Sequence, residues 1–142
     1  MHKNKRTPNC QGRSVKVKSA ILGILQRDGS IYTVPIPIAT GKVILPIIND
    51  VVRKGSRIYT DEFRPYRILR KGYKHDFVNH KAGQYVKGEA STNGVECYWS
   101  LFKRGVRGTY TSISKKHLEK YLNEFTFRFN NRKNGIGQTF DL

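Results

Sequence analysis

The apolar residues of this chain recur at two different spacings, which separate a strand-rich first part from a helical end. A short apolar run, Ser19 to Leu25, stops at Asp28-Gly29, and a second run extends from Ile31 to Ile38. Short apolar runs are typical of buried strands, and Asp-Gly is a strong hairpin-turn signal. We therefore expect an antiparallel hairpin. Its second strand should lie at a sheet edge, because Pro35 and Pro37 each remove a backbone donor.

The middle of the chain alternates between helical and extended patterns. Apolar residues at three- and four-residue spacing predict a helix that Thr40 caps and that runs to about Arg53. A strand over 56–60, a short helix over 63–69 and a weaker strand over 76–78 follow. The expected order is β, β, α, β, α, β, which indicates one α/β domain.

The carboxyl half is predicted to be helical after a loop over 79–89. Asn93 opens one helix to about Arg104, and Ser114 opens another. The second helix carries an apolar stripe that is most simply core. The stripe consists of Leu118, Tyr121, Leu122, Phe125 and Phe129.

The charge balance indicates that this domain binds nucleic acid. The 142 residues contain 27 Lys and Arg against 10 Asp and Glu, a net charge of +17. A charge of this size favours nucleic acid, although a basic ribosomal or RNA-packaging protein fits composition equally well. Cys10 and Cys97 lack the spacing of a disulfide framework or zinc site, and no apolar run reaches the length of a membrane span. We expect a cytoplasmic protein with free thiols.

Asp61 is the first candidate for chemistry, because it ends a predicted strand. Side chains at the carboxyl ends of strands in α/β sheets line the crevice where ligands bind, and a carboxylate there can hold a divalent metal. The structural alternative is that Asp61 caps the short helix that begins at Glu62 or Phe63.

Glu96 and Lys103 lie seven residues apart, nearly two full helical turns, so a carboxylate and a cation face the same place. We interpret Glu96 as a metal ligand and Lys103, with Arg104, as a contact to DNA phosphate. The alternatives are a capping box from Asn93 to Glu96 and a solvated ion pair. Asn93 could also supply an oxygen ligand, and nothing ranks it below Glu96.

Further DNA contacts are expected from the loop over 79–89, through His80, Lys81 and Lys87, and from Arg107 on the helical half. A solvated connector is the alternative for the loop. Tyr98 and Trp99 could stack on a frayed base at a DNA end, but at least one of them should be core.

Five stretches of the chain together carry a resemblance to a known family. They are Tyr59-Thr60-Asp61-Glu62, Val78-Asn79-His80, Gly83-Gln84-Tyr85-Val86, the run from Thr92 to Gly105, and Phe127-Arg128-Phe129-Asn130. Together they resemble the ISXO2-like transposases of the IS1595 insertion-sequence family. The resemblance implies an RNase H-like fold, Mg²⁺ or Mn²⁺, and DNA cleavage and strand transfer at the inverted repeats of a bacterial or archaeal mobile element. By that match Asp61 is the second catalytic acid, and Glu96 or Asn93 is the third position, followed by Lys103.

The chain departs from this family pattern at its start. The family's first catalytic Asp lies in an acidic strand just upstream of basic sequence like Lys3 to Arg6, and nothing here matches that strand. Asp28, in a turn, and Asp50, in a helix, do not replace it. We therefore expect an α/β, RNase H-like mixed sheet flanked by helices that lacks its first, central strand, and whose unpaired edges favour association.

The expected organisation is a basic flexible arm over 1–16, a partial RNase H-like transposase domain over 17–133 and a tail over 134–142. On this interpretation the chain is a transposase fragment that is inactive alone and acts with DNA, with itself or with full-length subunits, near the nucleoid. The alternative is a noncatalytic DNA-binding protein derived from a transposase. A weaker third hypothesis is an RNA-binding protein.

Overall fold

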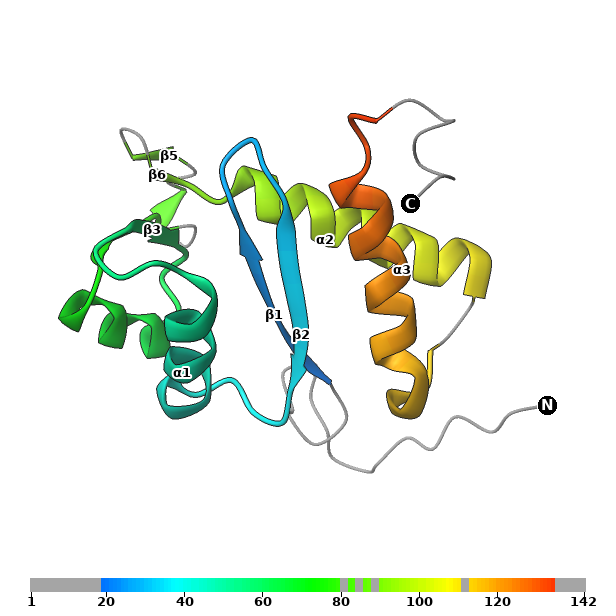
Figure 1. The fold of residues 1–142 in the computed structure, drawn as a ribbon, viewed down its shortest axis with the longest axis horizontal. Helices are drawn as coiled ribbons and strands as arrows, with labels where there is room; N and C mark the ends of the chain where they lie inside the picture. Colours follow the sequence, from blue (N-terminus) through cyan, green and yellow to red (C-terminus); the bar gives the residue numbers. More distant parts are fainter. Residues whose placement is uncertain (1–18, 80–81, 84–85, 88–89, 111–112, 135–142) are drawn as a thin grey trace.

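The computed structural model describes residues 19–79, 82–83, 86–87, 90–110 and 113–134 (Figure 1). The arm expected over 1–16 and residues 135–142 of the expected tail lie outside these ranges. Cys10, His80 and Lys81 lie outside them too, and the side chain of Lys87 is not described.

The predicted hairpin is confirmed and forms the centre of the fold. Strands β1 (Ala20–Leu25) and β2 (Ile31–Ile36) pair antiparallel, with Ile21 opposite Pro35. Asp28 adopts a positive φ of 56° in the turn, a conformation that Asp tolerates better than most residues. Among the described residues β2 pairs with β1 alone and is an edge strand, as predicted. The missing N–H of Pro35 therefore removes no hydrogen bond to a second neighbouring strand.

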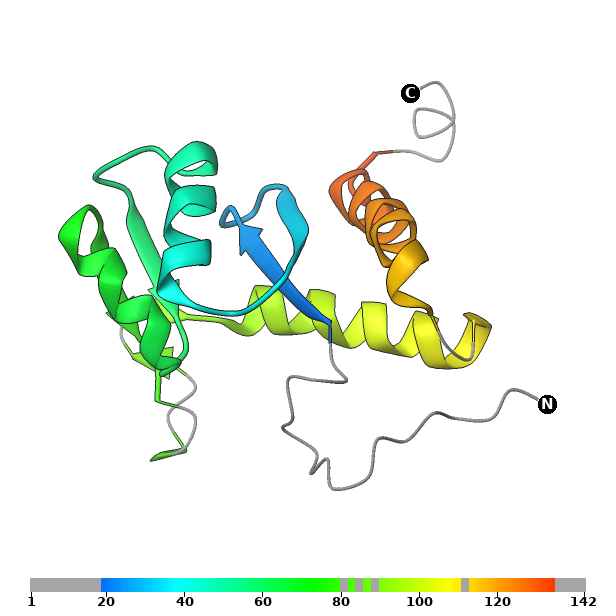
Figure 2. The same cartoon turned by 90° about the horizontal axis from the view of Figure 1, so that it is seen from below.

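Helices cover both faces of this hairpin (Figure 2). On one face, α1 (Gly41–Val51) and the 3₁₀ helix η1 (Arg64–Lys71) help to form a core cluster around Leu22. On the other, α2 (Asn93–Gly105) and α3 (Leu118–Asn130) form a second cluster with Ile31, and Ile21 packs against it. Successive strand residues point to opposite faces, so one hairpin supplies both cores.

The remaining strands form small separate sheets instead of joining the hairpin. Strands β3 (Arg57–Thr60) and β4 (Lys74–Phe77) pair parallel, while β5 (Val86–Lys87) and β6 (Ala90–Ser91) form a short antiparallel pair where a loop was expected. The described residues therefore contain three two-stranded sheets. The α/β class is confirmed, but the strands do not join into the single mixed sheet that was predicted.

Helix α3 is fixed to the exposed edge of β2 by side chains that replace a neighbouring strand. The Asn130 Oδ1 accepts from the Ile31 backbone N–H at 2.7 Å, and its Nδ2 donates to the Ile31 carbonyl at 3.0 Å. The hydroxyls of Thr126 and Thr33 are 2.7 Å apart. This amide clamp satisfies both backbone groups of a residue at an open strand edge.

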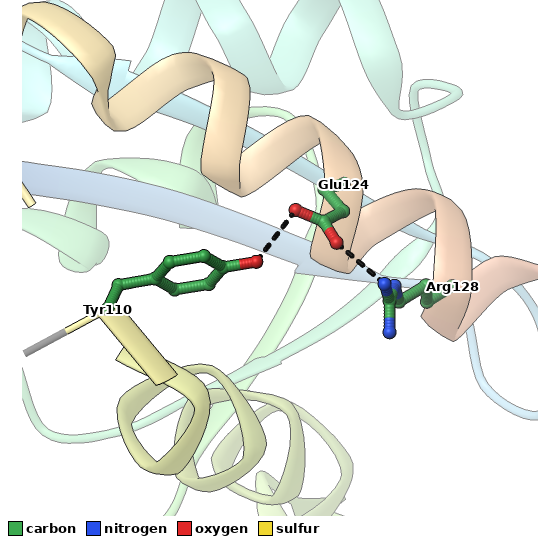
Figure 3. A network of polar contacts seen from close by, with 3 residues as sticks. All are labelled: Tyr110, Glu124 and Arg128. Carbon is green, nitrogen blue, oxygen red and sulfur yellow. Dashed lines mark hydrogen bonds and ion pairs between the residues drawn. The ribbon is translucent and has the colours of Figure 1, made fainter. Parts of the chain in front are cut away.

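A polar network joins α3 to the π-helical turn η3 (Val106–Tyr110) that extends α2 (Figure 3). The Tyr110 hydroxyl donates to Glu124 Oε2 at 3.2 Å, and Arg128 donates to Glu124 Oε1 at 2.7 Å. The Tyr110 ring also lies 4.5 Å from that of Tyr121, so Tyr121 of the predicted stripe packs here. Leu122, Phe125, Phe129 and Leu118 pack in the second core cluster, as expected.

Two predicted caps occupy N-cap positions but lack the side-chain bond of a cap. Thr40 precedes α1 but makes no side-chain capping bond, and α1 contains Pro46 and ends at Val51. Ser114 precedes the short 3₁₀ helix η4 (Lys115–His117), also without a side-chain cap, and α3 begins only at Leu118. In the described part of the chain, none of the helices combines the length and apolar character needed to span a bilayer.

Candidate functional site

Asp61 follows directly after β3, at the edge where the parallel strands β3 and β4 end. Its side chain is exposed, and its Oδ1 accepts a hydrogen bond from the Phe63 backbone N–H at 3.1 Å. The helix-capping alternative is therefore partly present, although η1 itself begins at Arg64. This local bond also orients the carboxylate at the strand end, as a ligand-binding role requires.

A hydrogen-bonded chain beneath Asp61 was not predicted from the sequence. The Thr60 hydroxyl donates to the Asp61 carbonyl at 2.9 Å and lies 2.8 Å from His75 Nε2 on β4. A hydroxyl has one proton to donate, so His75 donates from Nε2 and keeps a lone pair on Nδ1. That Nδ1 is buried and has no partner among the described residues.

The environment of His75 favours the neutral form of its ring. Burial lowers the pKa of His75, the Arg70 guanidinium lowers it further, and Asp76 opposes both. A proton on Nδ1 would be buried without an acceptor, which is consistent with this direction. The parallel pairing of β3 with β4 brings Thr60 and His75 together, and no motif in the sequence signals that pairing.

Glu96 lies in the first turn of α2 and is bound to the residue that precedes the helix. The Thr92 hydroxyl donates to Glu96 Oε1 at 2.7 Å, and the Glu96 backbone N–H donates to the Thr92 carbonyl at 3.0 Å. Thr92, not Asn93, is the cap position, so the predicted capping box from Asn93 is wrong. Asn93 is the first helical residue, and its side chain is exposed.

Three contacts bring the amino end of α2 and the end of β3 to the same region of the hairpin. A Cβ on Gly94 would lie 2.6 Å from the Leu25 side chain, so α2 begins against the end of β1. The Arg27 guanidinium lies 5.1 Å from the centre of the Tyr59 ring on β3. Strand β6, which leads into α2, lies beside β3. Asp61 and Glu96 therefore belong to elements that converge at the turn end of the hairpin.

The predicted phosphate contacts lie further along α2 and are exposed. Lys103 and Arg104 occupy the last turn of the helix, and Arg107 lies in the η3 turn. Lys103 lies on the same helix face as Glu96, about 10 Å further along the helix axis. These positions suit cations that contact a nucleic acid running along α2 away from Glu96.

Base stacking by Tyr98 is ruled out, because Tyr98 is core. Only 1% of its surface is exposed, and its hydroxyl lies 3.0 Å from the Thr126 hydroxyl. Trp99 is half-buried, and a Cβ on Gly23 would lie 2.6 Å from its ring. Trp99 therefore packs α2 onto β1, while Cys97 is a free and exposed thiol.

The side-chain oxygens of Asp61, Glu96 and Asn93 are of the type that binds a divalent cation. Mg²⁺ prefers oxygen ligands and is commonly bound through one or two carboxylates, with water and substrate phosphates completing its coordination. Asp61 and Glu96 carry carboxylates of this kind, and Asn93 carries an amide oxygen. Among the described residues, no group of three or more His, Cys, Asp and Glu side chains is placed to hold a metal ion.

Comparison with known proteins places these residues in a family context. The family model for the ISXO2-like transposase domain matches residues 1–130. The chain is 35% identical over 102 residues to an uncharacterized transposase-like protein of Haemophilus influenzae, covering 71% of this chain and 81% of that protein. It is 30% identical over 102 residues to an uncharacterized protein in transposable element ISH50 of Halobacterium salinarum, covering 70% of this chain and 34% of that protein. No solved structure matches the chain at a significant level.

Proposed function

Because this chain belongs to the ISXO2-like transposase family, we propose that it binds the DNA ends of an insertion sequence and brings Asp61 and Glu96 to the phosphodiester that is cut. The observation that carries the proposal is the convergence of the end of β3 with the amino end of α2 beside the turn of the hairpin.

In this function Asp61 and Glu96 hold Mg²⁺ or Mn²⁺, with Asn93 as a further oxygen ligand. When bound, such an ion polarises the phosphodiester and activates the attacking hydroxyl. The chain's own groups position the site. Phe63 N–H and Thr92 Oγ1 orient the two carboxylates, and the hydrogen bond from Thr60 to the Asp61 carbonyl holds the strand end.

The cations of α2 position the DNA on this site. Lys103 and Arg104 in the last turn of α2, with Arg107 beyond them in η3, neutralise DNA phosphates, and each contact makes binding more salt-dependent. His80, Lys81 and Lys87 are proposed as further phosphate contacts from the segment between β4 and β6.

We further propose that the strands form part of an RNase H-like fold. The hairpin β1–β2 and the parallel pair β3–β4 are separate, and a strand between β1 and β3 would join them into one mixed sheet. The family's first catalytic Asp belongs on such a strand. Because the described residues place no third acidic side chain with Asp61 and Glu96, we expect the 142-residue chain to bind DNA without cutting it.

A noncatalytic DNA-binding function is the second candidate, and a specific observation favours it. Both carboxylates make local bonds of the kind that hold strand and helix ends, Asp61 to Phe63 N–H and Glu96 to Thr92. In this function the net charge of +17 supplies affinity without any use of the acids.

The deciding experiment measures nicking and strand transfer on a labelled duplex that carries an insertion-sequence end, with Mg²⁺ or Mn²⁺. The 142-residue chain is compared with a version extended at its amino end by an acidic strand of the family pattern. Asp61→Asn plus Glu96→Gln is tested in both.

Nicking by the extended chain that disappears in the double variant supports the transposase proposal. If neither version cuts, and the double variant binds the duplex as tightly as the unchanged chain or more tightly, the noncatalytic function is correct. Equal binding to structured RNA and to the end duplex would instead favour an RNA-binding protein.

A further inference from the structure

Helix η1 carries three arginines on one side, and none of the sequence motifs pointed to them. Arg64, Arg67 and Arg70 are exposed, whereas Leu69 is fully buried and Tyr66 is half-buried. A 3₁₀ helix has three residues per turn, so side chains three positions apart lie directly above one another. The three arginine side chains therefore leave the helix in a single row, which we call the η1 ridge.

The length of the ridge suits the backbone of one nucleic-acid strand. At about 2 Å of rise per residue, Arg64 and Arg70 are about 12 Å apart along the helix axis. One DNA strand carries a phosphate about every 3.4 Å of axis, so the ridge spans three to four phosphates. Arginine also presents a planar fork of donors that matches phosphate oxygens.

The ridge is anchored to the fold at both ends. A Cβ on Gly41 of α1 would lie 3.3 Å from the Pro65 carbonyl oxygen, so the start of η1 packs against α1. At the other end the Arg70 guanidinium lies 5.9 Å from the centre of the Phe77 ring. A row on an anchored helix loses less conformational freedom on binding than the same charges on a loose segment.

The ridge begins beside Asp61. Phe63 donates its backbone N–H to Asp61 Oδ1 at 3.1 Å, and its ring packs edge-on against Tyr66 with 5.6 Å between ring centres. Burial and, secondarily, the charge of Asp61 raise the pKa of Tyr66 to about 12. A strand that follows the ridge is thus led to Asp61.

An exposed aromatic ring at the head of the ridge indicates which polyanion it fits. Phe63 is 41% exposed although it is a large apolar side chain. Nucleic-acid bases stack on exposed aromatic rings next to cationic grooves, whereas an acidic peptide needs only the cations. The combination therefore favours a nucleic acid over an acidic protein segment.

We propose that the η1 ridge is a second DNA-binding surface, separate from the α2 cations, which holds the phosphate backbone of the strand that enters at Asp61. This inference rests on the proposed function and deepens it by assigning a path to the DNA. The structural alternative is that the three arginines only form a solvated face.

The test is an equilibrium titration of an insertion-sequence end duplex in EDTA, so that no catalysis is involved, at salt concentrations from about 50 to 200 mM. The variant is Arg64→Gln plus Arg67→Gln, which leaves Arg70 on Phe77. Its matched control is Lys116→Gln plus Lys120→Gln, which removes the same charge from exposed positions at η4 and α3. Helix α3 lies on the opposite side of the hairpin from η1 (Figure 1).

Each lost phosphate contact lowers the slope of log affinity against log salt by about 0.9 for duplex and about 0.7 for single strands. Raising the salt from about 50 to 200 mM lowers the affinity of the unchanged chain by some factor, and for the ridge variant, with two contacts fewer, this factor should be about 7- to 12-fold smaller. The control variant should keep a factor close to that of the unchanged chain. Equal effects of the two variants, or no effect of either, would overturn the ridge while leaving the proposed function intact.

Two further outcomes are distinguished by the same titration. If the unchanged chain binds no DNA at all, the proposed function itself fails. If the ridge variant loses affinity only for a structured RNA and not for the duplex, the ridge is not a DNA surface and the proposal is wrong.

Discussion

Replacing Asn130 with Ala tests whether an amide on α3 holds the open edge of β2. The side chain bonds both backbone groups of Ile31, at 2.7 and 3.0 Å, across 99 positions of sequence. Ile31 is only 3% exposed and belongs to the second core cluster. The substitution therefore removes one acceptor and one donor from groups that water reaches poorly.

The expected cost follows from these two bonds. Each net hydrogen bond contributes about 0.5–1.5 kcal/mol, and a buried group left without a partner costs about 1–3 kcal/mol. Ala returns a few tenths of a kcal/mol through its higher helix propensity. We therefore expect Asn130→Ala to lower the free energy of unfolding by about 2–3 kcal/mol.

Urea unfolding followed by circular dichroism measures this loss, with Asn123→Ala as the matched control. Asn123 lies on the same helix and is exposed, so its replacement should be neutral or slightly stabilising. For a slope of about 1.5 kcal/mol per M, the midpoint of Asn130→Ala should fall by about 1–2 M. If the two variants agree within about 0.5 kcal/mol, the clamp does not hold β2 and the reasoning is refuted.

Three other predictions follow from the packing and from His75. Gly23→Ala should cost about 1–3 kcal/mol in urea unfolding, because a Cβ there meets the Trp99 ring at 2.6 Å, and most of this cost should vanish in a Trp99→Leu background. Tyr98→Phe should cost about 0.5–1.5 kcal/mol through the lost bond to Thr126, and an unchanged urea midpoint would contradict a stabilising role for this hydroxyl. Because the folded pKa of His75 lies below its ordinary 6.5, the unfolded state binds more protons in that range, so stability should fall as pH drops below about 6.5. His75→Gln should flatten this part of the pH dependence of the urea midpoint.

The sequence predicted the local elements well because their signals are local. Asp28-Gly29 and the flanking apolar runs predicted the hairpin, and three- and four-residue spacing predicted the core face of α3. Thr40 and Ser114 were predicted as caps from residue type alone. Whether a hydroxyl reaches the backbone depends on the path of the preceding chain, which residue preferences do not encode.

The site could be predicted only in part. Asp61 and Glu96 were identified from their positions at a strand end and in a first helical turn, and these positions are confirmed. Thr60 and His75 were missed because they meet only through the parallel register of β3 and β4. The arginines of η1 were missed because their three-residue spacing becomes a row only in a 3₁₀ helix.

The most direct measurement of the site is a Mn²⁺ titration of the chain bound to an insertion-sequence end duplex, followed through the backbone amide signals in NMR spectra. Paramagnetic broadening should centre on the residues around Asp61 and Glu96, and Asp61→Asn plus Glu96→Gln should abolish it. Broadening that centres instead on Asp50 or Glu119, or that persists unchanged in the double variant, would contradict a shared metal site at the end of β3 and the start of α2.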